Sequence, residues 1–245
     1  MKYLRTQMHS PKETLSIGWC DNGNVDGKFM EGVMNTSFAI MNSKINLVNS
    51  MRVQGNQIGR QRQVLFDAWA NQAKTDWLLW LDSDIVITQN SFNLVWNAAD
   101  KIAKPVVCGT YFVSKENEQS LMEPFPTLFN EGKDDFELKI IHPLPENQIL
   151  KIDSAGFGFV LMHKSIIDPI RKICPEYSLF AEKENIGEKF ISEDVVFFSN
   201  LKKAGIPLYA HTGAIVQHMK RFSLDYNYYS LYWNGLDKGI IKKDG

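Results

Sequence analysis

A run of five apolar residues, Trp77 to Leu81, is followed at once by Asp82, Ser83 and Asp84. A continuously apolar strand predicts a place inside a sheet that is covered on both faces, because a half-exposed strand would alternate with polar residues. Such sheets are typical of α/β proteins, in which helices cover both faces. Acidic residues at the end of this strand therefore lie where open α/β sheets bind ligands.

The composition agrees with a folded protein that has a large core. The chain has 245 residues, of which 44% are hydrophobic and 22% charged, the ordinary balance of a globular protein. Its 27 basic and 28 acidic residues give a net charge of -1. The net charge therefore does not indicate binding to a polyanion or to a membrane surface, although it does not exclude a local charged patch.

Cysteine usage and the chain's polar start bear on the compartment. Cys20, Cys108 and Cys174 are odd in number, lie far apart and match no zinc spacing, which predicts reduced thiols in the core. No apolar run approaches the roughly 18 residues of a membrane span, so we expect no transmembrane segment. Residues 1–11 lack the apolar core of a signal peptide. We therefore expect a cytoplasmic protein.

Strand and helix patterns alternate along the first half of the chain. Strands are predicted at 15–20, 45–53, 77–81, 85–87 and 106–113, and helices at 28–41, 54–73 and 91–103. This alternation predicts a mostly parallel central sheet with helices on its faces. Since no repeat or low-complexity segment interrupts the chain, we expect one domain over 1–245.

The second half carries different patterns. Four prolines within 114–152 predict loops and a small hairpin laid over the sheet. Further elements are predicted as a tight bend at 154–158, strands at 159–162, 207–211 and 214–218, and helices at 165–173 and 192–204. The tail 223–245 is aromatic and basic. Two interpretations stay open for it: a closing element packed against the core, and a surface that stacks a sugar, a base or a lipid headgroup.

Asp82 and Asp84 lie two residues apart at a strand end, so their side chains are expected to point the same way. Carboxylates this close repel each other unless a cation or hydrogen bonds compensate their charge. Mg²⁺ and Mn²⁺ take oxygen ligands, often one or two carboxylates together with substrate phosphates. The motif therefore indicates a divalent-metal site. The alternative is a solvated strand end with turn-forming Asp and Ser.

A second acidic pair, Glu193 and Asp194, follows Ser192 at a predicted helix start. Acidic residues in a first turn complement the helix dipole, and Ser192 can serve as the N-cap. The functional alternative is a general base that removes a proton from an incoming hydroxyl group.

His218 ends the last apolar run and is followed closely by Lys220 and Arg221. A lone histidine after a strand is often structural, and His211 is interpreted that way. Two neighbouring cations, however, suit a diphosphate leaving group, which favours a site at His218.

Other phosphate and metal motifs are weak or absent. Asn56, Arg60 and Arg62 begin a helix, whose N–H groups can bind an anion, and both arginines are expected to project away from its apolar side. The Gly156 to Gly158 turn lacks the rest of a dinucleotide fingerprint, and no P-loop motif is present. The loop 21–27 does not fit a calcium loop, since its sixth position is not glycine.

In this order the features resemble one family. The chain is similar to GT-A-fold glycosyltransferases that use a nucleotide-diphosphate sugar, in the broad family-2-like group that includes small phage and bacterial members. The resemblance covers about Leu15 to Arg221. Its more specific pieces are Asn56–Arg60, Trp77–Asp84, Val107–Phe112, Ser154–Phe159 and Ser192–Phe197.

The resemblance implies a GT-A fold, Rossmann-like, with a nucleotide-binding half at 15–113, an acceptor and metal half at 114–222 and a C-terminal tail at 223–245. It implies transfer of a sugar from a nucleotide-diphosphate donor, with UDP-sugar preferred, to a hydroxyl acceptor, using Mn²⁺ or Mg²⁺. The acceptor class stays open among a glycan, a lipid-linked glycan, a protein and modified DNA. The donor sugar, the stereochemical outcome and the oligomeric state also stay open.

The resemblance assigns donor-binding residues by position. Trp19 and Asp21 would hold the nucleobase, while Asn56 and Arg60 would help to fix the nucleotide. Ser83 belongs to the same strand-end motif and would also contact the donor.

Metal and leaving-group roles follow in the same way. Asp82 would lie near the ribose or the metal, and Asp84 and His218 would bind the metal. Lys220 and Arg221 would stabilise the charge of the leaving diphosphate.

The acceptor side is implied by two further motifs. Gly156 and Gly158 would line the donor sugar and acceptor. Asp194 or Glu193 would face the acceptor hydroxyl as the catalytic base, and the resemblance leaves open which of the two does so.

Two other function classes compete. A nucleotidyltransferase would need a Gly-rich, basic phosphate loop after the first strand, whereas the loop 21–27 contains no Lys or Arg. A non-catalytic carbohydrate- or nucleotide-binding module would need no base, so the acidic pair argues against it. Metal dependence of nucleotide binding discriminates between the module and the transferase.

Overall fold

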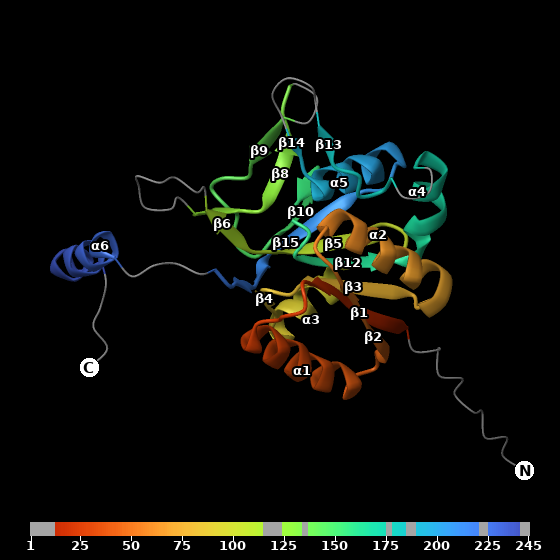
Figure 1. Cartoon of the computed structure of the whole chain (residues 1–245), viewed down its shortest axis with the longest axis horizontal. Coiled ribbons are helices and arrows are strands. Elements are labelled where there is room, and N and C mark those ends of the chain that lie inside the picture. Colours follow the sequence, from red (N-terminus) through yellow and green to blue (C-terminus); the bar gives the residue numbers. More distant parts are fainter. Residues whose placement is uncertain are drawn as a thin grey trace, which may run out of the picture.

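The computed structural model describes residues 13–114, 124–133, 137–174, 178–184, 190–220 and 225–240. Its centre is a seven-stranded sheet in the order β10-β15-β5-β12-β3-β1-β2 (Figure 1). The strands are β1 (Thr14–Asp21), β2 (Asn46–Gln54), β3 (Trp77–Asp82), β5 (Val106–Thr110), β10 (Ile149–Ile152), β12 (Phe159–His163) and β15 (Leu208–Ile215).

Most of these strands run in one direction. The pairs β1–β2, β1–β3 and β5–β15 are parallel. β12 is antiparallel to both β3 and β5, and β10 is antiparallel to β15 at the edge. The prediction of a mostly parallel α/β sheet is confirmed. The antiparallel insertion of β12 between two parallel strands is a feature that the alternation of patterns does not predict.

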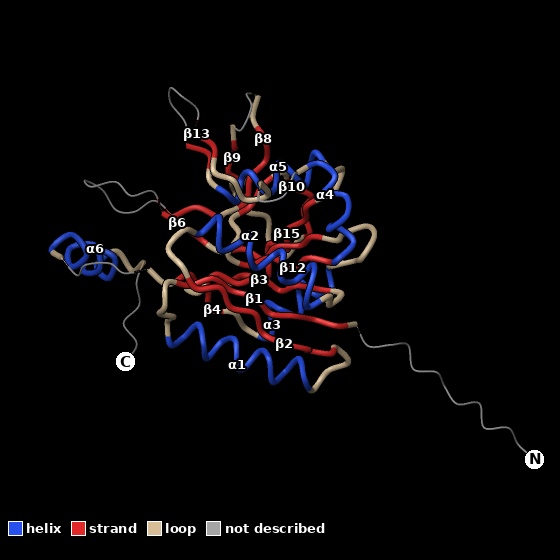
Figure 2. Tube along the Cα trace, turned by 45° about the vertical axis from the view of Figure 1, so that its right-hand side comes forward, coloured by secondary structure: helices blue, strands red, loops and turns tan. Residues whose placement is uncertain are grey.

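Helices cover both faces of the sheet (Figure 2). β3 shows why its sequence is apolar throughout: Trp77, Leu79 and Leu81 pack on one side, and Leu78 and Trp80 on the other. One face is covered by α1 (Gly27–Met41) and α3 (Gln89–Ala98). The opposite face is covered by α2 (Ile58–Ala68), α4 (Ile167–Ile173) and α5 (Glu193–Lys203). All three cysteines are buried, as predicted.

Local capping sets the helix boundaries. Asp26 caps α1, because its carboxylate accepts from the backbone N–H of Lys28 at 2.8 Å. Thr88 and Ser91 form a reciprocal capping box at the start of α3. The helix predicted at 91–103 ends at Ala98, five residues early. Asp100 then accepts from two backbone N–H groups, which holds the chain in a turn.

The other predicted helices form with small changes at their ends. α2 begins at Ile58 and continues into a π-helical turn (Trp69–Ala73), which together match the helix predicted at 54–73. A short 3-10 turn (Lys164–Ile166) precedes α4.

Short strands form small sheets separate from the central one. The segment 114–152, predicted as loops and a hairpin, contributes β8 (Leu128–Glu131) and β9 (Leu138–Ile140), which form a three-stranded sheet with β11 (Ser154–Ala155). β6 (Phe112–Ser114) pairs with β7 (Pro124–Pro126), and β13 (Lys183–Glu184) pairs with β14 (Phe190–Ile191). β10 also lies in this segment but joins the main sheet, so the prediction missed one strand of the core sheet.

The apolar run after Asp84 does not continue β3. β4 (Ile85–Val86) pairs antiparallel with β16 (Gln217–His218) in a separate ribbon. The prediction that residues 85–87 resume the same strand is therefore wrong. The chain turns at Ser83 and Asp84, and β4 pairs with β16 instead. This ribbon joins two motifs that are more than 130 residues apart in sequence.

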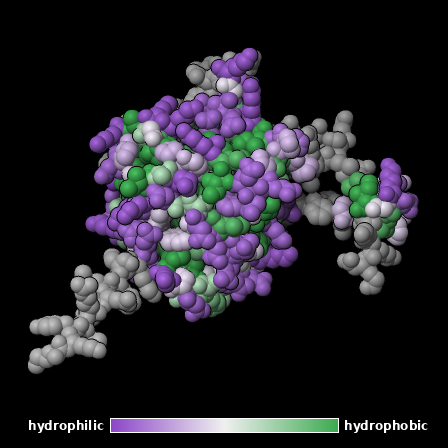
Figure 3. Space-filling model, turned by 180° about the vertical axis from the view of Figure 1, so that it is seen from behind, coloured by the Kyte–Doolittle hydropathy of each residue, from purple (hydrophilic) through white to green (hydrophobic). Residues whose placement is uncertain are grey.

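The aromatic tail forms α6 (Tyr226–Asp237), which stands apart from the sheet in Figures 1 and 3. Of the two interpretations of the tail, a helix is therefore found, but it is not packed on the sheet in these views. Across the residues that the structure describes, no helix is long and apolar enough to cross a bilayer.

Polar contacts between Thr14 and Asp76 connect the starts of β1 and β3. The Asp76 carboxylate accepts from the backbone N–H and the hydroxyl of Thr14 at 2.9 and 2.7 Å. Its other oxygen lies 2.7 Å from the Lys164 ammonium group. Although partial burial opposes ionisation, these partners lower the pKa of Asp76 to about 2.

We expect Asp76→Asn to lower the free energy of unfolding by about 1–2 kcal/mol at pH 7. The native pKa of Asp76 lies below its unfolded value, so the stabilisation is present above about pH 4 and is lost as the pH falls through about 2. Urea denaturation at pH 7 and at low pH measures this difference. Glu31→Gln, on the exposed side of α1, is the control. An equal loss at both pH values would contradict the role of the charge.

Candidate active site

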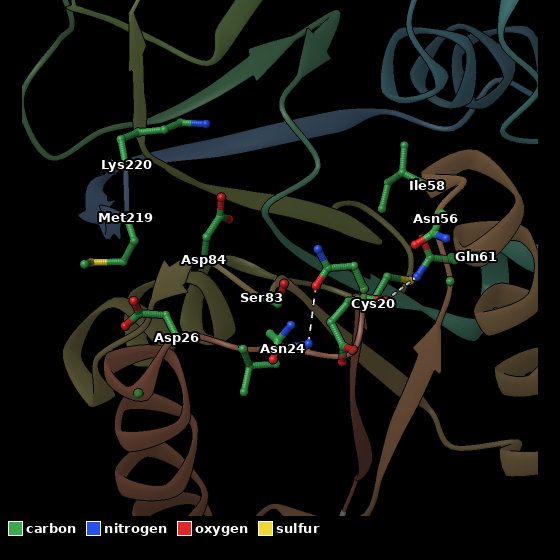
Figure 4. Close-up of a pocket in the computed structure, with 15 residues that line it drawn as sticks. Cys20, Asn24, Asp26, Asn56, Ile58, Gln61, Ser83, Asp84, Met219 and Lys220 are labelled. Carbon is green, nitrogen blue, oxygen red and sulfur yellow. Dashed lines mark hydrogen bonds between the residues drawn. The ribbon is translucent and has the colours of Figure 1, made fainter. Parts of the chain in front are cut away.

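A cavity of about 1000 Å³ lies at the edge of the sheet where β1, β2 and β3 end. We call it the edge cavity. Figure 4 shows Asp84 and Lys220 on one side of it, and Asn56, Ile58 and Gln61 on the other. It is lined by Cys20, Asp21, Asn22, Asn24, Val25, Asp26, Gly27, Gly55, Asn56, Ile58, Gln61, Ser83, Asp84, Met219 and Lys220. The fold thus gathers four segments that are distant in sequence around one opening.

The structure brings several predicted residues to this cavity and leaves others elsewhere. Asp21, Asn56, Ser83, Asp84 and Lys220 line it. The remaining predicted residues that the structure describes are outside its lining: Trp19, Arg60, Asp82, Gly156, Gly158, Glu193, Asp194 and His218. Arg221 lies outside the described residues.

Asp84 and His218 form the most specific contact beside the cavity. Nε2 of His218 lies 3.1 Å from Oδ2 of Asp84, and Nδ1 lies 3.0 Å from the carbonyl oxygen of Phe112. A carbonyl oxygen only accepts, so Nδ1 must carry a hydrogen. Nε2 of the neutral ring then directs a lone pair at a carboxylate oxygen. Such an arrangement is stable only when a proton or another cation lies between the two atoms.

The β4–β16 ribbon holds this pair in place. The backbone N–H of Met219 donates to the carbonyl oxygen of Asp84 at 2.8 Å, and His218 is paired with Ile85. Burial opposes ionisation of Asp84, but the hydrogen bond from His218 and the charges of His218 and Lys220 lower its pKa overall. Asp84 is therefore held as a carboxylate whose side chain is 43% exposed.

The side chains of Asp84 and His218 fit a divalent cation whose remaining ligands come from a substrate. An imidazole nitrogen and a carboxylate oxygen suit Mn²⁺, and the other imidazole nitrogen is fixed by a backbone carbonyl, as is usual for metal-binding histidines. Among the residues described, no cluster of three or more His, Cys, Asp or Glu side chains could hold a metal. Asp84 and His218 would thus be two protein ligands, and phosphate oxygens would have to complete the shell.

Asp82 has a different partner from Asp84. Both of its carboxylate oxygens lie 3.1 Å from Nη2 of Arg62, whose Nη1 donates to Glu193 at 2.7 Å. The two aspartates therefore do not point the same way, since β3 ends at Asp82 and Asp84 lies beyond it in the turn. A buried guanidinium group therefore compensates the charge of Asp82.

The prediction that Arg62 projects away from the apolar side of α2 is wrong, and the sequence analysis gave Arg62 no role in the site. It is 4% exposed, and its guanidinium group lies 4.8 Å from the centre of the Phe157 ring. The signal was present in the spacing: position 62 lies four residues after Ile58 and four before Phe66, on the apolar side of α2. Arg60, by contrast, is exposed and borders a second, adjoining groove.

The two residues of the second acidic pair, Glu193 and Asp194, also have different partners. Glu193 is buried and bound to Arg62, and burial raises its pKa although the charge of Arg62 opposes the shift. Asp194 accepts from the Ser192 hydroxyl and from the backbone N–H of Val195, and both bonds go to Oδ1. Within the described part of the chain, Oδ2 of Asp194 receives no hydrogen bond.

The glycine turn is held by Tyr111, a second residue that the sequence interpretation missed. The Tyr111 hydroxyl accepts from the backbone N–H of Gly158 at 3.2 Å, and a Cβ at position 156 would lie only 2.1 Å from it. The Tyr111 ring also packs edge-on against His218 at 5.2 Å. Tyr111 thus connects the glycine turn to the Asp84–His218 pair, and Gly156 is required by this close approach.

Trp19 and Asp21, which the resemblance assigns to nucleobase binding, lie in different surroundings. Trp19 is buried against Phe29, with ring centres 5.9 Å apart. The Asp21 carboxylate is bound by Arg52 at 2.5 and 2.7 Å and by the N–H of Gly23 at 2.7 Å. Both side chains therefore have structural partners. The amide groups of Asn22 and Asn24, which also line the cavity, were not singled out from the sequence.

Comparisons with known proteins support the fold. No family model matches the sequence, and no curated protein matches it. The structure is similar to GalNAc-T7, solved with UDP, GalNAc and Mn²⁺, with a TM-score of 0.51 and 11% identity over 86% of this chain and 44% of that chain. This likeness shows a GT-A-like fold and, at such low identity, the fold alone.

Two further solved structures match with lower TM-scores. One is A197 from STIV, with a TM-score of 0.48 and 19% identity over 85% of this chain and 86% of that chain. The other is a glycosyltransferase involved in the glycosylation of the major capsid of PBCV-1, with a TM-score of 0.46 and 12% identity over 85% and 95% of the two chains.

We expect Arg62→Met to lower the free energy of unfolding by about 3–5 kcal/mol, because it leaves the buried Glu193 and the partly buried Asp82 without a counter-ion. Arg60→Met, two residues away on the exposed side of α2, is the matched control and should change stability by less than about 0.5 kcal/mol. Adding Asp82→Asn and Glu193→Gln to Arg62→Met should restore part of the loss. Urea denaturation measures all three. Equal effects at positions 60 and 62 would contradict the buried network.

Proposed function

We propose that this chain is a metal-dependent glycosyltransferase that transfers a sugar from a nucleotide-diphosphate donor, a UDP-sugar, to a hydroxyl group of an acceptor. The observation that carries the proposal is the Asp84–His218 pair at 3.1 Å, with Nδ1 of His218 fixed on a backbone carbonyl. It lies beside a large polar cavity at the carboxyl ends of parallel strands, where α/β sheets bind nucleotides. The GT-A-like fold supports the same conclusion.

The edge cavity is proposed as the donor site. Asn22, Asn24 and Asn56 offer amide groups for a nucleoside, while Lys220 stands beside Asp84 on the opposite side. Asp84 and His218 would hold Mn²⁺ or Mg²⁺, which when bound neutralises the charge of the leaving diphosphate. Lys220, and Arg221 next to it in sequence, would stabilise the same charge.

Asp194 is proposed as the catalytic base rather than Glu193. Glu193 is occupied by Arg62 at 2.7 Å, so a proton on it would cost a buried ion pair. Asp194 is half-buried, and its Oδ1 is fixed by Ser192 and Val195. Its Oδ2 can then accept the proton of an acceptor hydroxyl as that oxygen attacks the sugar.

The glycine turn and Asp82 complete the proposal. Gly156 and Gly158 would border the donor sugar, with Tyr111 setting the position of the turn. Asp82 is proposed to act through Arg62, as part of the frame behind the site, and not as a metal ligand. We extend the same proposal to one domain over 1–245, with donor residues in 15–113 and acceptor and metal residues in 114–222.

The first test is thermal unfolding with UDP, GDP, CDP or AMP, each with and without Mn²⁺. We expect UDP with Mn²⁺ at about 100 times its Kd to raise the Tm by about 5–10 °C, since a ligand of the folded state stabilises it by mass action. Asp84→Ala and His218→Ala should lose the metal-dependent part of this rise. Glu31→Ala, an exposed acidic residue of α1, should keep it.

The outcomes separate the competing function classes. A rise with UDP that does not need Mn²⁺ would favour a binding module. No rise with any diphosphate, with or without Mn²⁺, would overturn the donor site.

The second test concerns the base. We expect Asp194→Asn to lower the rate of UDP release from a panel of UDP-sugars by about 10²–10⁴-fold, because the amide cannot accept the proton. The Tm rise with UDP and Mn²⁺ should be unchanged, since Asp194 does not line the edge cavity. Glu193→Gln is the comparison variant. A larger kinetic loss in Glu193→Gln than in Asp194→Asn, at equal protein stability, would reverse the assignment.

A further inference from the structure

α6 carries a stripe of apolar and aromatic residues that the proposed active site does not use. Tyr226, Tyr229, Trp233, Leu236 and Ile240 recur at intervals of three and four, so they lie on one side of the helix and its C-terminal continuation. Tyr226 is 78% exposed, Tyr229 57%, Trp233 44% and Ile240 77%. Large apolar side chains this exposed, gathered on one side, indicate a surface that binds a partner.

The other side of α6 is polar. Asn234 donates to the Ser230 hydroxyl at 3.2 Å, and Asp237 follows on the same side. Asp225 caps the helix by accepting from the backbone N–H of Tyr228 at 2.9 Å. Two exposed apolar or aromatic residues of α6 lie outside the stripe, Tyr228 and Leu231, each 42% exposed. The helix is therefore amphipathic, and its start is fixed by its own sequence.

Charge distinguishes this part of the chain from the rest. Residues 220–245 contain five basic residues (Lys220, Arg221, Lys238, Lys242 and Lys243) and three acidic ones, which gives a net charge of +2. The remaining residues contain 27 − 5 = 22 basic and 28 − 3 = 25 acidic ones, which gives −3. The basic residues flank α6 in sequence, and positive charge beside an apolar helix suits an anionic surface.

We propose that α6 binds the surface of an anionic lipid membrane and lies in the interface with its stripe toward the acyl chains. Tyrosine and tryptophan favour this environment, because one end of each ring is apolar and the other carries a hydrogen-bonding group. An amphipathic helix with lysines beside its apolar side binds anionic headgroups and apolar chains together.

Two other occupants fit the helix less well. A stable protein interface needs about 20–30 residues on each side, whereas the stripe has five side chains over about three turns, too short for a coiled-coil seam. A glycan platform needs open ring faces. The rings of Tyr226 and Tyr229 stack on each other at 6.0 Å with an interplanar angle of 28°, so those faces are partly covered.

The test uses the full chain and sedimentation with vesicles of phosphatidylcholine alone or with a third of phosphatidylglycerol. We expect binding to the anionic vesicles that weakens with added salt. The double variant Tyr229→Ser/Trp233→Ser should lose at least about tenfold in vesicle affinity, and Lys238→Gln/Lys242→Gln/Lys243→Gln should lose about as much. The matched control, Ser230→Ala/Asn234→Ala on the polar side, should bind like the unmodified chain.

Three results would overturn the inference: no binding of the unmodified chain to anionic vesicles, equal binding by the Tyr229/Trp233 double variant, or a concentration-dependent dimer that this double variant abolishes in the absence of vesicle binding. Thermal unfolding of each variant shows whether the body of the protein stays folded, since α6 stands apart from the sheet. Vesicle binding requires neither nucleotide nor Mn²⁺. Its outcome is therefore independent of the proposed transferase activity.

Discussion

The buried guanidinium group of Arg62 is the interaction on which the candidate site depends. It joins three elements that lie apart in the sequence: α2, which carries it, the end of β3 through Asp82, and the start of α5 through Glu193. Removing two carboxylates from water without a counter-ion would cost several kcal/mol. One arginine offsets both charges, and in doing so it fixes where α5 begins and therefore where Asp194 lies.

In each acidic pair, one residue is bound to Arg62 and the other is not. Asp82 and Glu193 are held by Arg62, whereas Asp84 contacts His218 and lines the edge cavity, and Asp194 is bound by Ser192 and Val195. The division follows from chain geometry. Asp82 is the last residue of β3 and Asp84 lies in the turn beyond it, so their side chains reach different surroundings although only one residue separates them.

Strand direction brings the glycine turn to the same edge. β12 runs antiparallel between β3 and β5, so its first residues lie where the neighbouring strands end. The N–H of Asp82 consequently donates to the carbonyl oxygen of Gly158 at 3.0 Å. Tyr111, just beyond β5, packs against both the turn and His218. One reversed strand thus places the glycine turn beside the acidic motif and the histidine.

The sequence by itself determined the layered α/β fold, because apolar runs such as Trp77 to Leu81 can be buried only between two layers of helices. It also singled out Asp84, His218 and Asp194 as candidates by their places at strand and helix ends. It did not reveal the antiparallel β12, the pairing of β4 with β16 or the burial of Tyr111, and it placed Arg62 on the wrong side of its helix. Local patterns report which faces of an element are apolar. Only the tertiary structure decided which charges meet inside, since that depends on contacts between residues 20 to 134 positions apart.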